Sequence, residues 1–600
     1  MPPAVPDAGA PRRLKIHSAG WIAALVMLVA VVTTAAAADR KATVPLANLE
    51  ELSAWTPEQA PWNAARQPLR PRAAASHPLA DLWVSRTPRQ RAKGGVIAMH
   101  DMGAGYLPEQ DRFPGGSHNK ALYRFTHWQY IDTFIYFSHA RVSYPPPGWT
   151  DSAHRNGVRS LATFNIEGES GESRAELRAL LDDASRRRAY ARKLARVARA
   201  YGFDGYLVNI ETELPGNAER KRRRAKSLQR FVAELRREMR KVTPAATVIW
   251  YDSIVRSGRL RYQNELNVQN EPFFAAADGI TVNYDWSPPY DAGSPQHSAK
   301  VAGDRARDVY SSVDVFCRES EREYCGFRSF LGARAAFRGG TSFGVFGPAW
   351  TYEGDGAKPD RSNFVGRDHR FWIGTDGEAV PRRGIAEFVA ARPIPHALPF
   401  ATHFDQGFGT AVYRDGAVSK RGAWGNVGHI DVLPTWRDVA MAGGSGFRAA
   451  LTTDAAFEGG SSFRVAADGR ATGYTLRPLF RSAFAGVETV TSTVREDGLQ
   501  AAIIIVAAHP EKPDAPEVLV LLPPGKDRAP ARVRFGLSGK AKVVRLGPER
   551  TKHLHGWSRR SYSIGATLEG RTIAAIGILA YPGASPGAKP SVLLGELGLR

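Results

Sequence analysis

Apolar residues in the first two-thirds of the chain form short continuous runs of strand length, separated by longer polar–apolar stretches. In the stretches at 173–201 and 218–241 apolar positions recur every three or four residues, which is typical of helices. The strand-like runs are 94–103, 131–139, 159–167, 205–211, 247–253, 279–286, 311–318 and 341–353. Eight buried strands with helices between them predict an α/β fold, a (β/α)8 barrel of parallel strands over residues 91–393.

The pattern changes beyond residue 394, where short alternating runs are separated by Gly, Pro and Asp and long helical patterns stop. This pattern predicts a β-sandwich region at 394–583 that forms one domain or two. The tail at 584–600 is Pro/Gly-rich and is expected to be loose. Residues 39–90 are rich in Ala, Pro and Arg with little periodicity, which indicates a linker or an N-terminal arm that wraps the barrel.

The N-terminal 38 residues have the layout of an export signal. Arg12, Arg13 and Lys15 precede a long apolar run that ends in the small residues 36–38. A basic start, an apolar middle and a small-residue end are typical of a cleaved signal peptide. The run is nearly long enough to cross a bilayer, so an uncleaved membrane anchor is the alternative. We therefore expect an exported protein that is periplasmic, secreted or on the cell surface. It would contact the membrane only if the N-terminal segment is not cleaved.

The net charge of +22 raises the question of a nucleic-acid partner. Much of the basic charge falls in 186–241, where apolar Leu228, Phe231 and Leu235 recur at helical spacing. That arrangement favours an amphipathic helix with a solvated basic face. Zinc-finger spacing, RNA-binding aromatic motifs and Gly-rich phosphate loops are absent from the sequence, so we expect no nucleic-acid partner.

Two cysteines, Cys317 and Cys325, stand eight residues apart. In an exported protein they favour one local disulfide. Two thiols without a neighbouring His cluster make a poor metal site, so no metal is expected.

One strand ends in a pair of polar residues. Asn209 and Glu211 close the run at 205–211, and residues two apart on a strand point to the same side. Burying a carboxylate is costly unless it is paired or used, so the pair is either a hydrogen-bonded plug or a chemical site. Barrel active sites lie at the carboxyl ends of the strands, which is where Glu211 stands. Acids, amides and aromatic residues at the other strand ends suit a sugar ligand.

An amide beside an acid suggests a particular chemistry. Glycoside cleavage usually needs two carboxyl groups, and an amide cannot replace the nucleophile. It can hold a 2-acetamido group of the substrate so that the acetamido oxygen attacks C1, which is substrate-assisted catalysis.

Several stretches together resemble glycoside hydrolase family 85, the endo-β-N-acetylglucosaminidases that act on N-glycans. The resemblance covers roughly residues 94–440. It is carried by HDMGAGYL (100–107), HWQYIDTFIYFSHARVSYPPPGWTDSAHRNGV (127–158), FDGYLVNIE (203–211), WYDSIVRSGRLRYQNELN (250–267), FFAAADGITVNYDW (273–286), DVYSSVDVF (308–316), FGPAWTYE (346–353) and LPFATHFDQGFG (398–409).

The resemblance implies roles for three residues. Glu211 looks like the general acid/base, Asn209 like the residue that orients the acetamido group, and Tyr251 like a helper that hydrogen-bonds the acetamido oxygen. Two positions depart from the family: Tyr262 stands where Trp is frequent, and Cys317 where Gly is frequent. The candidate substrate-binding residues are Trp286, Trp350, Tyr262, Asn283, His139 and Tyr352.

The family implies cleavage of the β-1,4 bond between the two GlcNAc residues of an N-glycan core. The reaction would retain configuration through an oxazolinium intermediate, with possible transfer to an acceptor alcohol and without metal or cofactor. The substrates would be N-glycans of glycoproteins or free oligosaccharides. Two alternatives remain: a non-catalytic glycan-binding surface protein, and another acetamido-dependent hydrolase such as a chitinase, although the DxxDxDxE pattern of chitinases is missing from the fourth strand.

Overall fold

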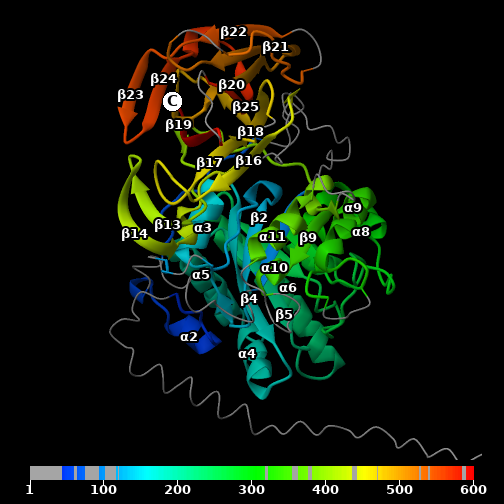
Figure 1. Cartoon of the computed structure of the whole chain (residues 1–600). Helices are drawn as coiled ribbons and strands as arrows, with labels where there is room; N and C mark the ends of the chain where they lie inside the picture. Colours follow the sequence, from blue (N-terminus) through cyan, green and yellow to red (C-terminus); the bar gives the residue numbers. More distant parts are fainter. Residues whose placement is uncertain are drawn as a thin grey trace, which may run out of the picture. The chain divides into compact units, whose positions relative to one another are not determined.

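A computed structural model of the chain is shown in Figure 1. Residues 43–600 form one compact unit, and the expected export signal at 1–38 lies outside the described residues. The structure describes residues 43–59, 64–73, 94–101, 116–118, 121–317, 322–353, 363–375, 382–434, 442–468, 471–525, 529–537, 541–583 and 589–600.

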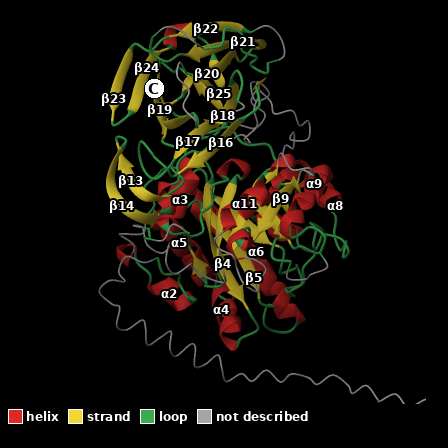
Figure 2. Ribbon diagram, in the orientation of Figure 1, coloured by secondary structure: helices red, strands yellow, loops and turns green. Residues whose placement is uncertain are grey.

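The first part of the described chain is a closed barrel of eight parallel strands (Figures 1 and 2). Neighbours run in chain order, and β1 pairs with both β2 and β9, which closes the ring. This confirms the predicted fold class. The strands are β1 (Val96–Asp101), β2 (Thr133–Phe137), β4 (Arg159–Glu167), β5 (Gly205–Glu211), β6 (Thr247–Tyr251), β7 (Gly279–Val282), β8 (Val309–Asp314) and β9 (Ser342–Phe346). A short strand, β3 (Val142–Ser143), pairs antiparallel with β4.

Helices follow or precede the strands as the periodicity predicts. The stretch at 173–201 is two helices, because the Asp183 side chain accepts hydrogen bonds from the amides of Ser185 and Arg186 and starts a new helix there. The helices around the barrel are α3 (Pro147–Arg155), α4 (Gly171–Leu181), α5 (Ala184–Tyr201), α6 (Ala218–Arg240), α7 (Glu271–Ala276), α8 (Pro295–Ala302), α9 (Ser329–Gly339), α10 (Trp350–Glu353) and α11 (Phe364–Trp372).

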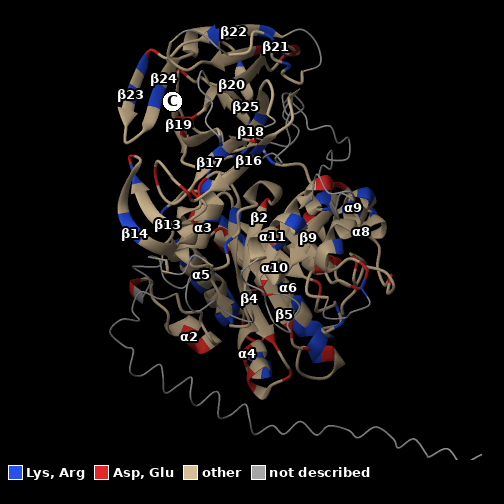
Figure 3. Cartoon of the chain, in the orientation of Figure 1, with Lys and Arg blue, Asp and Glu red and all other residues tan. Residues whose placement is uncertain are grey.

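Helix α6 carries the densest basic charge of the chain. Its apolar side chains Leu228, Phe231 and Leu235 are fully buried in the barrel core, and most of its Lys and Arg residues, blue in Figure 3, are exposed. The long helix with a solvated basic face is therefore confirmed.

The last barrel run is shorter than the sequence indicates. Strand β9 ends at Phe346, Gly347 adopts a positive φ of 72°, and residues Trp350–Glu353 form α10. Trp350 and Tyr352 consequently sit on a helical turn and not at a strand end. An apolar run continues through this turn because α10 is itself partly buried, so composition alone does not mark the break.

The C-terminal part is a two-sheet β-sandwich with an attached hairpin. The two sheets share a single apolar core, to which Val465, Val490 and Leu594 contribute from one sheet and Phe480, Ile505 and Ile576 from the other. One sheet contains β12 (Phe400–Thr402), β16 (Phe447–Thr452), β17 (Ser462–Ala467), β19 (Thr489–Asp497), β23 (Arg550–Leu554), β24 (Trp557–Ser563) and β26 (Ser591–Leu599); the other contains β15 (Ala442–Gly443), β18 (Thr475–Ala485), β20 (Leu499–His509), β21 (Lys512–Leu521), β22 (Lys542–Leu546) and β25 (Thr572–Pro582). The hairpin is β13 (Phe408–Arg414) with β14 (Ala417–Gly425).

The prediction of a loose tail at 584–600 is wrong for its described part, residues 589–600; residues 584–588 lie outside the described residues. Residues Ser591–Leu599 form β26, which lies between β17 and β19 in its sheet. Leu594, Leu597 and Leu599 are fully buried. The strand is held by partners that precede it by about a hundred residues or more, so its local Gly and Pro content gave no sign of it.

Described parts of the predicted linker lie along the barrel as an arm. Helix α2 (Leu49–Ala54) places Leu49 and Leu52 in the barrel core. Farther on, the Arg72 guanidinium donates to the carbonyl oxygens of Ile131 and Trp128 at 2.9 Å each. These contacts favour the interpretation of an N-terminal arm over that of a linker.

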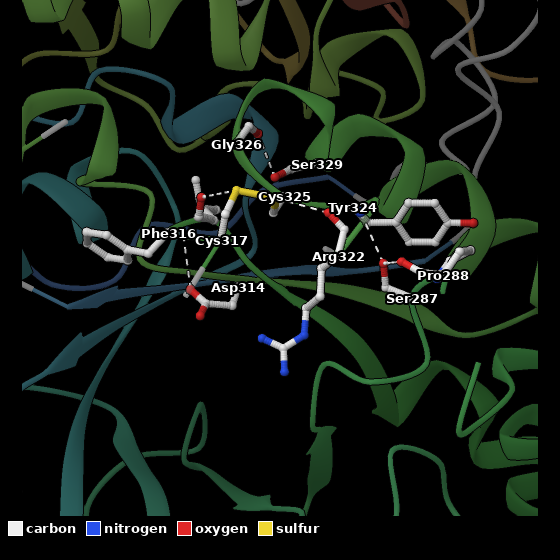
Figure 4. The surroundings of a disulfide bond; sticks show 11 residues. Ser287, Pro288, Asp314, Phe316, Cys317, Arg322, Tyr324, Cys325, Gly326 and Ser329 are labelled. Atoms are coloured by element: carbon white, nitrogen blue, oxygen red, sulfur yellow. Dashed lines mark hydrogen bonds between the residues drawn. A yellow bond between two sulfur atoms is a disulfide. The ribbon is translucent and has the colours of Figure 1, made fainter. Parts of the chain in front are cut away.

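A disulfide joins Cys317 and Cys325, with their Cα atoms 5.2 Å apart (Figure 4). Cys317 follows β8, and Cys325 precedes a short 3-10 helix at Gly326–Arg328. Inside the closed loop, the Arg322 guanidinium contacts Asp285 at 2.5 Å and the Tyr324 amide donates to the Ser287 hydroxyl at 3.0 Å. The crosslink closes the loop after β8, and these two contacts tie that loop to the loop after β7.

The two thiols are expected to be unreactive in the native protein. Maleimide labelling of folded, non-reduced protein should modify neither cysteine, and reduction under denaturing conditions should expose both. Because the crosslink closes a short loop, reduction should lower the free energy of unfolding by roughly 2–3 kcal/mol. Two reactive thiols in the native, non-reduced protein would show that the bond does not form.

Candidate active site

The neighbouring strands β4 and β5 end in the same sequence, Asn-Ile-Glu. Their parallel register places Asn165 opposite Asn209 and Glu167 opposite Glu211. Both pairs stand at the carboxyl ends of barrel strands, where side chains from different strands converge. Two amides and two acids are thus arranged in adjacent rows at the barrel mouth.

Asn209 is buried, with 2% of its surface exposed. Its Nδ2 donates to Asn165 Oδ1 at 3.0 Å and to Glu211 Oε2 at 2.8 Å, so both amide protons are used. Its Oδ1 is buried and accepts no hydrogen bond from the residues that the structure describes. Since an unpaired buried acceptor is costly, this oxygen marks a place where a donor fits.

Glu211 is partly exposed and is held from both sides. Its Oε2 accepts from Asn209, and its Oε1 accepts the hydroxyl proton of Tyr262 at 2.6 Å. Burial, with the Glu211 charge as the next cause, raises the pKa of the Tyr262 phenol above its ordinary value. The phenol therefore stays protonated and serves as a donor to the carboxylate.

A chain of hydrogen bonds runs from Tyr251 through two asparagine side chains. Its hydroxyl donates to Asn283 Oδ1 at 2.8 Å, and Asn283 Nδ2 donates to Asn264 Oδ1 at 2.7 Å. Burial raises the pKa of Tyr251 well above its ordinary value, and the neighbouring Tyr284 and Glu211 add to the rise. Tyr251 is a neutral hydroxyl held in place by the amide of Asn283, which Asn264 holds in turn.

Asp252 fixes the loop that carries Tyr262. It is fully buried, and its Oδ2 accepts from the amides of Gln263 and Asn264 at 2.9 and 2.7 Å. Its Oδ1 accepts from Asn270 Nδ2 at 2.8 Å. Burial raises the pKa of Asp252 from 3.8 to about 6, although these hydrogen bonds oppose the rise. Asp252 is thus a positioning residue for the loop.

The buried Asp252 predicts a pH dependence of stability. Because its folded pKa lies above its unfolded pKa, the native state holds the proton up to about pH 6, and stability falls as the pH rises from about 4 to 7. The loss should be on the order of 2–3 kcal/mol. Denaturant unfolding of the wild type and of Asp252→Asn across this pH range tests it. The variant should lack this component; parallel curves for the two proteins would contradict it.

The predicted sugar-binding residues separate into two groups. Tyr262, Asn283 and His139 lie at or beside the acid: Tyr262 and Asn283 by the contacts above, and His139 through a 2.6 Å contact from Nδ1 to Glu167 Oε1. The His139 side chain is 43% exposed, so it can meet a ligand.

The other group lies in or against the core. Trp286 is 3% exposed and its Nε1 donates to the carbonyl of Ser312 at 2.7 Å. Tyr352 is also 3% exposed. Trp350 is partly buried, with its ring centroid 5.0 Å from that of Phe327. Trp286 and Tyr352 therefore have no free ring face for stacking in this structure.

Sequence reasoning missed Asn165 and Asn264. Asn165 precedes Glu167 by two residues, as Asn209 precedes Glu211, and the repeated Asn-Ile-Glu was a signal that could have found it. Asn264 has a positive φ of 59° and lies in the loop after β6, so its role depends on a turn that no local pattern reveals.

Within the described part of the chain, no group of three or more His, Cys, Asp or Glu side chains has the arrangement of a metal site. Among the same residues, no helix combines the length and apolarity needed to cross a bilayer.

The fold and the site define a (β/α)8-barrel protein with an acid–amide pair at the carboxyl end of one strand. The sequence profile of glycosyl hydrolase family 85 matches residues 106–412, more than half of the 600 residues. The chain therefore belongs to glycosyl hydrolase family 85.

The relatives are consistent with this membership. The cytosolic endo-β-N-acetylglucosaminidase of Gallus gallus is 37% identical over 392 residues, which cover 65% of this chain and 48% of the relative. The Homo sapiens protein of the same name is 34% identical over 68% of this chain and 50% of its own length. This chain thus spans about half the length of the curated relatives it matches.

A solved structure shares the fold. The glycoside hydrolase domain of Endo-D from Streptococcus pneumoniae matches with a TM-score of 0.70 at 20% identity, covering 93% of this chain and 82% of that one.

The prediction of an exported protein is wrong. The matching relatives from Gallus gallus, Mus musculus and Homo sapiens are all named cytosolic. The export prediction depended on a short compositional pattern at the N-terminus, whereas the comparison extends over several hundred aligned residues. An apolar run with a basic flank is a much less specific feature than an alignment of that length.

Proposed function

We propose that this protein is an endo-β-N-acetylglucosaminidase that cleaves the β-1,4 bond between the two GlcNAc residues of an N-glycan core. The observation that carries the proposal is the Asn209–Glu211 pair at the barrel mouth, with the buried Asn209 Oδ1 unpaired among the described residues. Membership of glycosyl hydrolase family 85 and the names of the relatives support it.

Asn209 is suited to hold a 2-acetamido group. The carbonyl oxygen of its side chain can accept the acetamido N–H, since both protons of its own amide are bound to Asn165 and Glu211. Accepting that proton turns the acetamido oxygen toward C1 and favours the positive charge that develops on nitrogen. Tyr251, a neutral buried hydroxyl, would leave Asn283 and donate to the acetamido oxygen.

Glu211 then acts in two steps. As an acid it protonates the leaving oxygen while the acetamido oxygen attacks C1, which gives an oxazolinium intermediate. As a carboxylate it next removes a proton from water, which opens the intermediate with net retention. An acceptor alcohol in place of water would give transglycosylation. Tyr262 holds Oε1 of this carboxyl by one hydrogen bond throughout.

The test is to incubate the protein with an N-glycosylated glycoprotein and, separately, with chitin oligomers. We expect mass spectrometry to find a single GlcNAc left on the asparagine and no shortening of the oligomers. Cleavage of chitin oligomers instead would identify a chitinase. Binding of the glycan without cleavage would identify a non-catalytic glycan-binding protein.

A further inference from the structure

A basic cavity of about 470 Å³ lies at the same end of the barrel as the candidate active site. It is formed by the first turns of α6 and by the loop that follows β6, both at the carboxyl end of the barrel. Lys221, Arg222, Arg259 and Arg261 line it, and no carboxylate does. We call this cavity the basic pocket.

Most of the charge in the basic pocket is not neutralised. Lys221 is paired with Glu213. Arg222, Arg259 and Arg261 are exposed, and none of them has an ion pair or side-chain hydrogen bond with any residue that the structure describes. The amino end of α6, whose peptide dipoles favour negative charge, opens on the same cavity through Ala218. Three unpaired guanidinium groups and a helix amino end favour an anion.

The frame that carries these groups is rigid. The Val255 amide donates to the carbonyl of Arg259 at 3.1 Å, and the Arg261 amide donates to the carbonyl of Ser253 at 2.9 Å. Arg259 and Arg261 are two residues apart on this paired backbone, so their side chains leave from the same side. Gly258, with a φ of 83°, lets the turn touch α6, since a Cβ there would lie 2.4 Å from the carbonyl oxygen of Lys221.

One loop, the one after β6, connects the basic pocket to the acid. Tyr262 stands between Arg261 and Gln263, which both line the cavity, so its side chain leaves the other face of this backbone, where its hydroxyl binds Glu211 Oε1. Glu211 Oε2 faces Asn209, the candidate acetamido residue. If the acetamido group lies on the Asn209 side, the leaving group lies on the Oε1 side, toward Tyr262 and the loop that carries the basic pocket on its other face. This step rests on the proposed function.

We propose that the basic pocket receives an acidic side chain of the polypeptide that carries the glycan. The leaving group is the GlcNAc attached to asparagine, and the polypeptide continues from it on the side of the basic pocket. Arginine matches a carboxylate with two parallel N–H donors, and a local excess of positive charge raises the rate of encounter with an acidic chain. The protein therefore prefers N-glycans on acidic stretches of sequence.

The experiment uses two glycopeptides with the same glycan, one with Asp and Glu around the glycosylated asparagine and one with Asn and Gln. At low salt the kcat/KM of the wild type should be about tenfold higher for the acidic peptide than for the neutral one. The preference is modest because each exposed ion pair contributes little binding free energy. The preference should fall to about one near 0.5 M salt, where charges are screened over a few ångströms.

The triple variant Arg222→Gln, Arg259→Gln, Arg261→Gln should lose the preference while cleaving the neutral peptide at the wild-type rate. The matched control is Arg448→Gln, Arg495→Gln, Arg550→Gln, which removes the same charge from exposed positions of the sandwich and should keep the preference. Equal kcat/KM for the two peptides in the wild type would overturn the proposal. The proposal would also be overturned if acidic groups on the glycan raised kcat/KM and acidic residues of the peptide did not.

Binding separates this proposal from the proposed function. Titration of Glu211→Gln with both glycopeptides measures affinity without cleavage. Tighter binding of the acidic peptide, lost on adding the three Arg→Gln changes, supports the basic pocket even if no bond is ever cleaved. Equal affinity for the two peptides, or a preference that survives the three changes, overturns it even if the protein is an active endoglycosidase.

Discussion

Glu211→Gln is expected to abolish hydrolysis of N-glycans by a protein that remains folded. General acid–base catalysis contributes roughly 10²–10⁴-fold, and Gln can neither give nor take the proton. The fold should persist because Gln can keep both contacts: its carbonyl oxygen accepts from Asn209, and its amide donates to Tyr262 once that hydroxyl turns. The measurement is the rate of GlcNAc–peptide formation by mass spectrometry, with thermal unfolding to check the fold.

The matched control for this variant is Glu213→Gln. Glu213 lies two residues farther along, outside the strand, in an ion pair with Lys221. Removing its charge should change the rate by less than about threefold, because partly exposed ion pairs contribute little. A Glu211→Gln protein that hydrolyses at the wild-type rate, or a Glu213→Gln protein that fails, would move the acid away from Glu211.

Asn209→Ala is expected to lose hydrolysis of a natural glycan, by roughly 10²-fold or more, yet to keep transfer from a preformed sugar oxazoline to a GlcNAc acceptor. Asn209 serves the formation of the oxazolinium, and an oxazoline donor enters after that step. Glu211 remains to activate the acceptor alcohol. Both donors are assayed with one preparation of the variant, so a difference in folding cannot produce the split.

Glu211→Gln provides the contrast for this second prediction. It should fail with both donors, because activation of the acceptor still needs a base. Equal losses of Asn209→Ala with the two donors would show that Asn209 only supports the barrel mouth. Full hydrolysis of the natural glycan by Asn209→Ala would remove this residue from the mechanism.

The barrel could be predicted because its strands are buried on both faces. Strands β4 and β5 are continuous apolar runs that stop at polar residues, and the predicted bounds 159–167 and 205–211 agree with the structure. The acid and its amide could be placed for the same reason, since a strand of known direction fixes which residues reach the mouth. Strand β26 could not be found in this way, because its place depends on pairing with distant strands.

Side chains beyond the strand ends were harder to predict. Trp286 and Tyr352 follow barrel strands and are candidate substrate-binding residues in the sequence, yet both are buried in the core. Their direction is set by the turn after the strand, as with Gly347 before α10. Tyr262 and Asn264 reach the site only because a buried carboxylate, Asp252, folds their loop back.

The side-chain amide of Asn209 donates two hydrogen bonds, one to Asn165 and one to Glu211. Such a side chain cannot rotate without breaking a bond, and it is almost closed to solvent. The two N–H protons of its amide are therefore protected from exchange with water. One of these N–H groups is hydrogen-bonded directly to the reacting carboxyl of Glu211. With the nitrogen of this asparagine labelled, magnetic resonance could follow the proton on Glu211 through each stage of turnover, using a reporter that is part of the native site.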